Sequence, residues 1–292
     1  MISAGQNTAF STNKTLNIAG RLISLNTPLV MGVINITPDS FYAGSRQMHE
    51  AEVLAKVDQM MVEGASIIDV GGYSSRPGAE NISEHEEGNR VVNSIKAIKR
   101  KFPEIILSVD TFRSTIARMA VDEGADMIND ISGGELDAEM FNTVAKLQVS
   151  YCCMHMKGTP QTMGSFTQYS NLVHEIIVYF HQKIADLQRS GIKDILVDPG
   201  FGFAKTIDQN FQLMNNLELL KALGKPLLIG ISRKSMIWKT LQTSPEQALN
   251  GTTALNMVAL MKGASILRVH DVKEAVETIK LFTHLTHADG RV

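Results

Sequence analysis

Cysteine is scarce in this sequence, because its 292 residues include only two, the neighbours Cys152 and Cys153. A disulfide between adjacent residues is strained, and a zinc site needs more ligands at wider spacing. The scarcity therefore excludes a disulfide framework and a cysteine-based zinc site. We interpret the pair as two small residues of a buried strand. This use of cysteine fits a reducing cytosol, so a cytoplasmic protein is expected.

The chain also lacks an excess of charge of either sign, and it lacks a long hydrophobic run. The formal net charge of −2 gives no electrostatic basis for binding nucleic acid or an anionic membrane. No apolar run is long enough to span a bilayer, and residues 1–20 contain no apolar segment typical of a signal peptide. Neither nucleic acid nor a membrane is expected as a partner, and any bound anion must be held by local groups.

The sequence does contain a regular alternation of strand and helix patterns. Residues 67–70 form a short β-branched run with one carboxylate near its end and no polar alternation, which is typical of a strand buried on both faces. Strands are expected at residues 28–34, 66–70, 105–109, 126–129, 149–154, 194–197, 226–230 and 265–269. Helix patterns follow them at residues 49–63, 84–101, 114–123, 138–147, 169–190, 209–223, 233–261 and 272–286. These units predict an α/β protein with a single closed (β/α)8 TIM barrel.

The residues before the first barrel strand have a different pattern. Residues 1–13 are polar and irregular, so a disordered or irregular lead-in is expected there. Residues 14–25 have the pattern of a short hairpin, which we expect to cap the bottom of the barrel. No domain boundary interrupts the remainder, so residues 14–292 are interpreted as one barrel domain.

Polar residues recur at the points where the expected strands end. These residues are Asp69, Asp110, Asn129 and Asp198. A single Asp in such a position is more often a loop or helix cap, but in this type of barrel the strand ends meet at the active site. Carboxylates and an amide in one apolar mouth accept hydrogen bonds from a flat ligand rich in N–H donors, such as an amino-pyrimidinone ring. Met154 and Phe203 either line the faces of such a ring or are ordinary barrel packing.

Basic residues follow strands or glycine loops at the same end of the expected barrel. They are Arg76, Arg233, Lys234, Arg268 and His270. Residues 232–235 are expected to open a helix whose N-terminal amides favour an anion. Arg268 and His270 are two residues apart and project to one side of an extended segment, although His270 could instead be a core histidine. A diphosphate with Mg²⁺ fits these groups, and Asn35 could add an oxygen ligand.

Eight blocks of sequence together resemble the bacterial dihydropteroate synthases, the folate-pathway enzymes that sulfonamides inhibit. The blocks occur in the family's order at residues 31–41, 69–78, 109–111, 128–131, 154–156, 198–203, 232–235 and 268–272. The resemblance implies a pterin-binding TIM barrel that forms a homodimer. It also implies a transferase that condenses 6-hydroxymethyl-7,8-dihydropterin diphosphate with 4-aminobenzoate, giving 7,8-dihydropteroate and diphosphate. Sulfonamides are accordingly expected as inhibitors.

The resemblance further implies a role for each residue that matches the family's motifs. The residues expected to bind the pterin ring are Asp69, Asp110, Asn129, Met154, Asp198, Phe203 and Lys234. Those expected to contact the diphosphate are Asn35, Ser75, Arg268 and His270, with Asn35 also implied as the Mg²⁺ ligand. The aminobenzoate site is expected to include Phe41, Pro77 and Ser232. Catalytic roles are implied for Asp39, Arg76 and Lys234.

These expectations suit a dissociative substitution that needs no covalent enzyme nucleophile, because cationic groups and Mg²⁺ absorb the charge of the leaving diphosphate.

A pterin-dependent methyltransferase has no need of the basic residues at 232–235 and 268–270. An inactive pterin-binding paralogue would be expected to lose Asp39, Arg76 or Lys234, and all three are present. The chain departs from the family in having serine at Ser75, where threonine is usual, and in residues 42–45.

Overall fold

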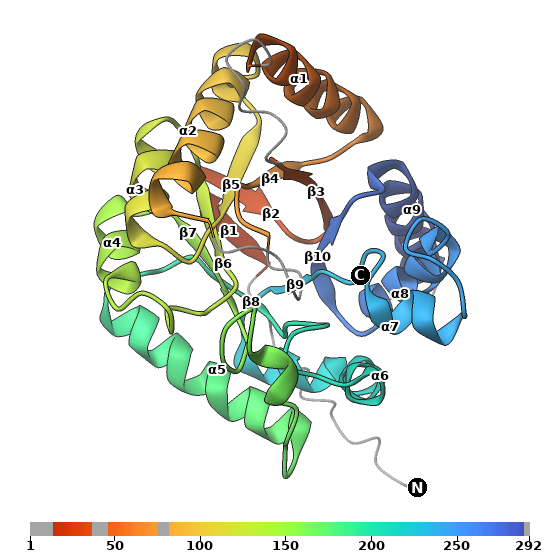
Figure 1. The fold of residues 1–292 in the computed structure, drawn as a ribbon. Helices are drawn as coiled ribbons and strands as arrows, with labels where there is room; N and C mark the ends of the chain where they lie inside the picture. The colour runs from red at the N-terminus through yellow and green to blue at the C-terminus, as the bar shows by residue number, and fades with distance from the viewer. Residues whose placement is uncertain (1–13, 37–45, 75–81, 289–292) are drawn as a thin grey trace, which may run out of the picture.

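The computed structural model describes residues 14–36, 46–74 and 82–288, and within them eight parallel strands close into a barrel (Figure 1). The strands are β3 (Leu29–Asn35), β4 (Ile67–Gly71), β5 (Ile106–Asp110), β6 (Met127–Asp130), β7 (Ser150–Met154), β8 (Ile195–Asp198), β9 (Leu227–Ile229) and β10 (Ala264–Val269). Each strand pairs with the next along the chain, and β10 returns to β3. The predicted (β/α)8 barrel is confirmed.

Helices surround the barrel, as Figure 1 shows. They are α1 (Arg46–Glu63), α2 (Glu84–Lys101), α3 (Ser114–Asp122), α4 (Met140–Leu147), α5 (Leu172–Arg189), α6 (Ile207–Asn215), α7 (Ser235–Thr240), α8 (Leu249–Met261) and α9 (Val272–Ala288). The helix predicted at residues 209–223 differs from the structure, where α6 is followed by a separate 3₁₀ helix, Leu217–Leu223. The helical stretch predicted at residues 233–261 is divided in the structure into α7 and α8.

A hairpin of β1 (Thr15–Ile18) and β2 (Arg21–Ser24) closes the N-terminal end of the barrel. The backbone N–H of Asn17 donates to Asp194 Oδ1 at 2.7 Å, just before β8 begins. Ser150 Oγ, at the start of β7, donates to Asn17 O at 2.9 Å. Two apolar side chains of β1 are buried with the side chains that fill the barrel. The predicted cap is confirmed as an apolar plug held by hydrogen bonds.

The apolar core has two main layers, one inside the barrel and one between the strands and the helices. Successive side chains of a strand point to opposite faces, so each strand contributes to both layers. Ile67 belongs to the inner layer and Ile68 to the outer one. Cys152 and Cys153 divide in the same way, and both are buried and free, as predicted for strand residues.

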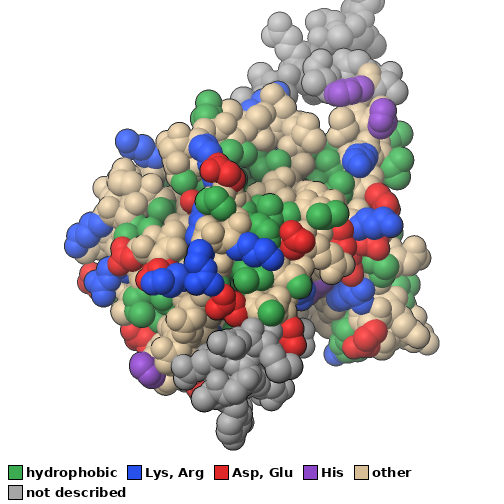
Figure 2. Space-filling view, turned by 90° about the horizontal axis from the view of Figure 1, so that it is seen from above, with side chains coloured by type: hydrophobic (Ala, Val, Ile, Leu, Met, Phe, Trp, Pro, Cys, Tyr) green, Lys and Arg blue, Asp and Glu red, His purple; other side chains and the backbone are tan. Residues whose placement is uncertain are grey.

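The surface carries charges of both signs. Figure 2 shows lysine and arginine side chains intermixed with aspartate and glutamate over the face in view, in agreement with the formal net charge of −2. Within the described ranges, no helix combines the length and the apolar character needed to cross a bilayer.

Candidate active site

Side-chain alternation brings a set of polar residues into the mouth of the barrel. On β4, Ile67 lies in the inner layer, so Asp69, two residues later, points the same way. The same spacing of two or four residues from an inner apolar side chain places further polar residues there: Asp110, Asn129, Asp198 and Arg268. All lie at or next to the C-terminal ends of their strands, where barrels of this type carry their active sites.

Arg268, from β10, joins carboxylates from two other strands. Its Nε donates to Asp69 Oδ2 at 2.6 Å, and its Nη2 donates to Asp110 Oδ2 at 2.6 Å. Asn129 Nδ2 donates to the same Asp69 oxygen at 3.2 Å. The second oxygen, Asp69 Oδ1, is buried and has no hydrogen-bond partner among the described residues. A buried acceptor of this kind favours a ligand that supplies an N–H donor.

The proximity of these charges in a buried site shifts their proton affinities. Burial raises the pKa of Asp110 to about 7, with Arg268 opposing the shift and Asp69 adding to it. Burial alone would lower the pKa of Arg268, but Asp69 and Asp110 raise it above the usual range. The guanidinium is therefore a permanent cation shared by two acidic groups, and the mouth keeps an excess of acceptors.

Lys234 reaches the mouth from the residue before α7. Its Nζ donates to the carbonyl oxygen of Phe201 and lies 4.8 Å from the centre of the Phe203 ring. Gly202 has a φ of 81°, and a Cβ there would lie 3.2 Å from Lys234 Cδ, so a side chain would crowd the lysine stem. Burial lowers the pKa of Lys234 to about 8, while Asp198 opposes the shift. Burial raises the pKa of Asp198, and Lys234 is the first of the groups that oppose it.

An apolar cluster lies beside these polar groups. Its buried members are Ile131, Met154, Met156, Met163, Phe203 and Ala204. Met154 ends β7 and is the register partner of Asp198 on β8, so the cluster borders the acceptors directly. Sulfur and aromatic groups pack well against the face of a flat ring. The arrangement can therefore hold such a ring while its edge reaches the carboxylates.

Asn35 ends β3 on the other side of the acidic group. At Gly71, on the neighbouring β4, a Cβ would lie 3.4 Å from Asp110 Cβ and 3.7 Å from Asn35 Oδ1, so both side chains lie next to the Gly71 backbone. In the part of the chain that the structure describes, no group of three or more His, Cys, Asp or Glu could hold a metal ion. A cation at Asn35 would need oxygens from a ligand, which is the usual way in which Mg²⁺ is bound.

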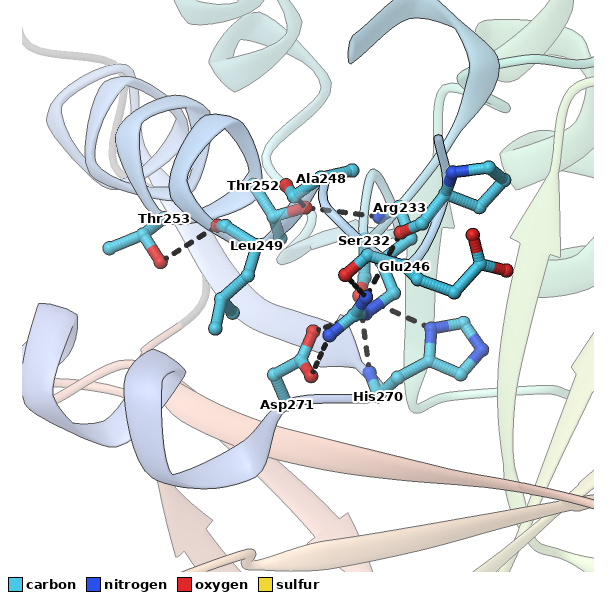
Figure 3. Close-up of polar contacts among 10 residues, drawn as sticks. Ser232, Arg233, Glu246, Ala248, Leu249, Thr252, Thr253, His270 and Asp271 are labelled. Carbon is cyan, nitrogen blue, oxygen red and sulfur yellow. Dashed lines mark hydrogen bonds and ion pairs between the residues drawn. The ribbon is translucent and has the colours of Figure 1, made fainter. Parts of the chain in front are cut away.

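Ser232 and His270 contact each other beyond β9 and β10 (Figure 3). Ser232 Oγ accepts from the backbone N–H of His270 at 3.2 Å and lies 3.2 Å from His270 Nδ1. Arg233 is occupied elsewhere: its Nε and Nη2 donate to Asp271 at 2.9 and 2.8 Å, and its Nη1 donates to two carbonyls between α7 and α8. The expectation that Arg233 faces an anion is therefore replaced by a role in holding the loop.

The structure brings most of the predicted site residues to one end of the barrel. Those in or beside the mouth are Asn35, Asp69, Asp110, Asn129, Met154, Asp198, Phe203, Ser232, Lys234, Arg268 and His270. Within this set Arg268 contacts the carboxylates of Asp69 and Asp110. The others lie outside the described residues: Asp39, Phe41, Ser75, Arg76 and Pro77.

One buried pair was missed by sequence reasoning. Lys205 Nζ lies 3.1 Å from His155 Nδ1 and donates to two carbonyls of the loop that carries Phe203. The signal that could have found it is a lysine directly after the glycine- and phenylalanine-rich segment at residues 200–204. A charged side chain that follows such an apolar segment either leaves it for solvent or is buried with partners, and here it is buried.

Comparison with known proteins decides the family. A model of the pterin-binding enzymes matches residues 31–270. The chain belongs to this family. It is 37% identical over 270 residues to a Haemophilus influenzae dihydropteroate synthase, covering 92% of this chain and 98% of the relative. For the Clostridium beijerinckii dihydropteroate synthase the identity is 43% over 256 residues, covering 86% and 92%.

Solved structures of pterin-binding enzymes superpose closely on the barrel. A Yersinia pestis dihydropteroate synthase with a sulfonamide drug has a TM-score of 0.87 at 38% identity, covering 94% of this chain and 99% of that one. A Xanthomonas albilineans dihydropteroate synthase with 4-aminobenzoic acid has a TM-score of 0.86 at 36% identity, with the same coverage. The predicted resemblance of this chain to the dihydropteroate synthases, within the pterin-binding enzymes, is confirmed.

Proposed function

We propose that this protein is a transferase of folate biosynthesis that carries out the dihydropteroate synthase reaction. It condenses 6-hydroxymethyl-7,8-dihydropterin diphosphate with 4-aminobenzoate, and it releases 7,8-dihydropteroate and diphosphate. The observation that carries the proposal is the unpartnered buried acceptor Asp69 Oδ1, at the centre of an acidic group in the mouth of a pterin-binding barrel. Such a site selects a ligand edge with several N–H donors, which the pterin ring supplies.

The pterin ring is held by complementary hydrogen bonds. Asp69, Asp110 and Asp198 accept from its amino and ring N–H groups, and Asn129 can both donate and accept. Lys234 is a cationic donor beside Asp198 and suits the ring carbonyl. Met154 and Phe203 cover the faces of the ring. Ligands without these donors would leave buried carboxylates unsatisfied, and this opposes their binding.

The reaction itself needs no enzyme nucleophile. The bond between the pterin methylene carbon and the diphosphate oxygen breaks, and the oxygen keeps the electron pair. The electron-rich pterin supports the positive charge that develops on the methylene carbon, and the fixed carboxylates of the mouth favour that charge. The nitrogen lone pair of 4-aminobenzoate then forms the new C–N bond, and the resulting ammonium releases a proton.

The leaving diphosphate is proposed to lie beside Asn35, His270 and Ser232, with Arg268 reaching it from the acidic group. Asn35 would hold Mg²⁺ through its side-chain oxygen, together with oxygens of the diphosphate and water. When bound, Mg²⁺ offsets the negative charge of the leaving group. The fit rests on the donor set, because Asn35 supplies a side-chain oxygen and the described residues by themselves do not encage a metal.

The aminobenzoate site is proposed to include Ser232, with Phe41 and Pro77 from the two long loops. The Xanthomonas albilineans relative was solved with 4-aminobenzoic acid, and the Yersinia pestis relative with a sulfonamide drug. We extend both ligands to this chain. Catalytic roles for Asp39 and Arg76, and the contact of Ser75 with diphosphate, remain predictions from the sequence.

The proposal also covers assembly and compartment. A homodimer is expected from the family resemblance, and size-exclusion chromatography with light scattering tests it. The two free cysteines, Cys152 and Cys153, are buried, and burial raises the pKa of both thiols. Thiols of this kind suit the reducing cytoplasm expected for the protein.

The decisive experiment measures diphosphate release with the pterin diphosphate, Mg²⁺ and 4-aminobenzoate, omitting one component at a time. Release that requires all three components, with dihydropteroate as the product, is expected. Tight pterin binding without turnover would contradict the synthase and favour an inactive pterin-binding protein. Transfer of a methyl group from a pterin donor would favour a methyltransferase instead.

A further inference from the structure

The loop between β8 and α6 is organised around a buried lysine. Lys205 Nζ donates to Gly200 O at 3.0 Å and to Phe203 O at 3.1 Å, and it lies 3.1 Å from His155 Nδ1. Lys205 is only 8% exposed and His155 only 2%. Two carbonyl oxygens and one ring nitrogen surround the Lys205 nitrogen, so all three of its hydrogen-bonding positions are used. Burial lowers the pKa of Lys205 to about 7, while Asp198 opposes the shift. The loop therefore curls around one buried and fully satisfied amino group.

His155 joins both ends of this loop. Its backbone N–H donates to Asp198 O at 3.0 Å, where the loop begins, and its ring meets Lys205, where the loop ends. The ring packs edge-on against Tyr179, with the ring centres 4.9 Å apart. Burial lowers the pKa of His155 to about 2, and the nearby Lys205 adds to the shift. The imidazole is therefore neutral, and its Nδ1 can accept from the ammonium form of Lys205 or donate to the neutral form.

The backbone of the loop permits only a narrow arrangement. Gly200 has a φ of 71°, and a Cβ there would lie 2.1 Å from His155 O, so the two chain segments meet backbone to backbone. The Gly200 N–H also donates to Asp198 Oδ1 at 2.8 Å. Because Lys205 draws the carbonyls of Gly200 and Phe203 toward itself, the carbonyl of Phe201, between them in the loop, is left for Lys234 Nζ.

We propose that Lys205, with His155 as its hydrogen-bond partner, is a positioning residue for the pterin site. It holds the loop in the shape that presents the Asp198 carboxylate, the Phe203 ring and the Phe201 carbonyl that anchors Lys234. Lys205 does not touch the substrate. This inference rests on the proposed function, because it assumes that Asp198 and Lys234 bind the pterin.

The first variant is Lys205→Met, which keeps the length of the side chain and removes its donors. The matched control is Lys225→Met, because Lys225 is also 8% exposed but lies just before β9, at the opposite end of the barrel. Isothermal titration with the pterin diphosphate and Mg²⁺ measures affinity, and thermal melting measures stability. Lys205→Met is expected to weaken pterin affinity by about tenfold or more, since small displacements of binding groups have large effects. Lys225→Met is expected to keep wild-type affinity.

A second pair of variants tests the contact between Lys205 and His155. His155→Asn can keep a hydrogen-bonding group near the position of Nδ1, whereas His155→Leu removes it. Pterin affinity is expected to be close to wild type in His155→Asn and to fall in His155→Leu. Steady-state KM for 4-aminobenzoate, at saturating pterin diphosphate, is expected to change little in either variant. This separation of the two substrates would not arise from a general loss of stability.

The outcomes separate this inference from the proposed function. Failure of the wild-type protein to bind the pterin diphosphate would contradict the function itself. Wild-type binding with equal affinity in Lys205→Met, even at a lower melting temperature, would overturn the positioning role and leave the function standing. If Lys205→Met does not fold, the His155 pair decides, and equal pterin affinity in His155→Asn and His155→Leu would overturn the inference.

Discussion

Arg268 and Asp69 lie 199 residues apart in the sequence, and their side chains meet at 2.6 Å in the mouth of the barrel. The pair uses only Oδ2 of Asp69 and leaves Oδ1 buried without a partner among the described residues. Arg268 thus binds the carboxylate without using all of its acceptor capacity. A ring rich in N–H donors can supply the hydrogen bond that Asp69 Oδ1 lacks.

Replacing Asp69 by asparagine should weaken pterin binding more than it weakens the fold. We expect a loss of about 10- to 100-fold in affinity, because a hydrogen bond to a charged group contributes roughly 1.5–3 kcal/mol. Isothermal titration with the pterin diphosphate measures it. Asp126→Asn is the matched control, since Asp126 is a buried carboxylate paired with Lys99 at the start of β6, far from the mouth. Similar affinity losses in both variants would contradict the assignment.

Asp110 should make the stability of the protein depend on pH. Its pKa is about 7 in the folded chain against an ordinary value of 3.8, so the folded state binds the proton more tightly. The resulting stabilisation is fully present below pH about 4 and is lost as the pH rises to about 7. At about 1.4 kcal/mol for each tenfold change in proton affinity, the effect is at most roughly 4 kcal/mol.

Urea unfolding at a series of pH values between 4 and 8 tests this prediction. Relative to the wild type, Asp110→Asn is expected to show a flatter dependence of the free energy of unfolding on pH, because the amide does not titrate. Parallel curves for the two proteins would show that Asp110 titrates near its ordinary value in the folded state.

Lys234 should impose an alkaline limit on activity. Burial lowers its pKa to about 8, so its ammonium loses a proton as the pH rises through that value and ceases to be a cationic donor. We expect kcat/KM for the pterin diphosphate to fall above pH 8. Lys234→Met should lower kcat/KM at pH 7 and abolish the fall above pH 8. Lys234→Arg should shift any remaining fall to a higher pH. If the fall in kcat/KM above pH 8 were unchanged in Lys234→Arg, the titrating group would be another residue.

Arg233 should matter for stability and little for substrate binding. Its bidentate contact with Asp271 and its bonds to loop carbonyls hold the segment between β9 and α8. We expect Arg233→Met to lower the free energy of unfolding by about 2 kcal/mol, measured by urea denaturation, with KM for both substrates nearly unchanged. A large rise in KM for the pterin diphosphate without loss of stability would restore the original expectation of an anion contact.

Removal of Mg²⁺ should affect the diphosphate and not the pterin ring. Because the described residues do not form a metal cage, Mg²⁺ alone is expected to bind the free protein too weakly for titration. EDTA should weaken binding of the pterin diphosphate and leave binding of 6-hydroxymethyl-7,8-dihydropterin unchanged. Tight binding of Mg²⁺ to the free protein would show that the metal has more protein ligands than Asn35.

Much of the site follows from local features of the sequence. A strand is recognised from its own residues, and alternation decides which of them face inward, so the positions of Asp69, Asp110, Asn129 and Asp198 at inward-facing strand ends were predictable. The number of strand–helix units predicted barrel closure for the same reason. The sequence pattern did not predict that a separate 3₁₀ helix, Leu217–Leu223, follows α6.

The sequence by itself therefore determined the barrel, its capping hairpin and the polar residues at the strand ends. Only the tertiary structure decided which charges pair. Arg233 and Arg268 look alike in sequence, yet one is bound to Asp271 in a loop and the other to Asp69 inside the mouth. Lys205 is buried beside His155, which lies 50 residues away in the sequence and supplies one of its hydrogen-bond partners. The physical reason is that pairing depends on distances across a closed barrel, which no local pattern encodes.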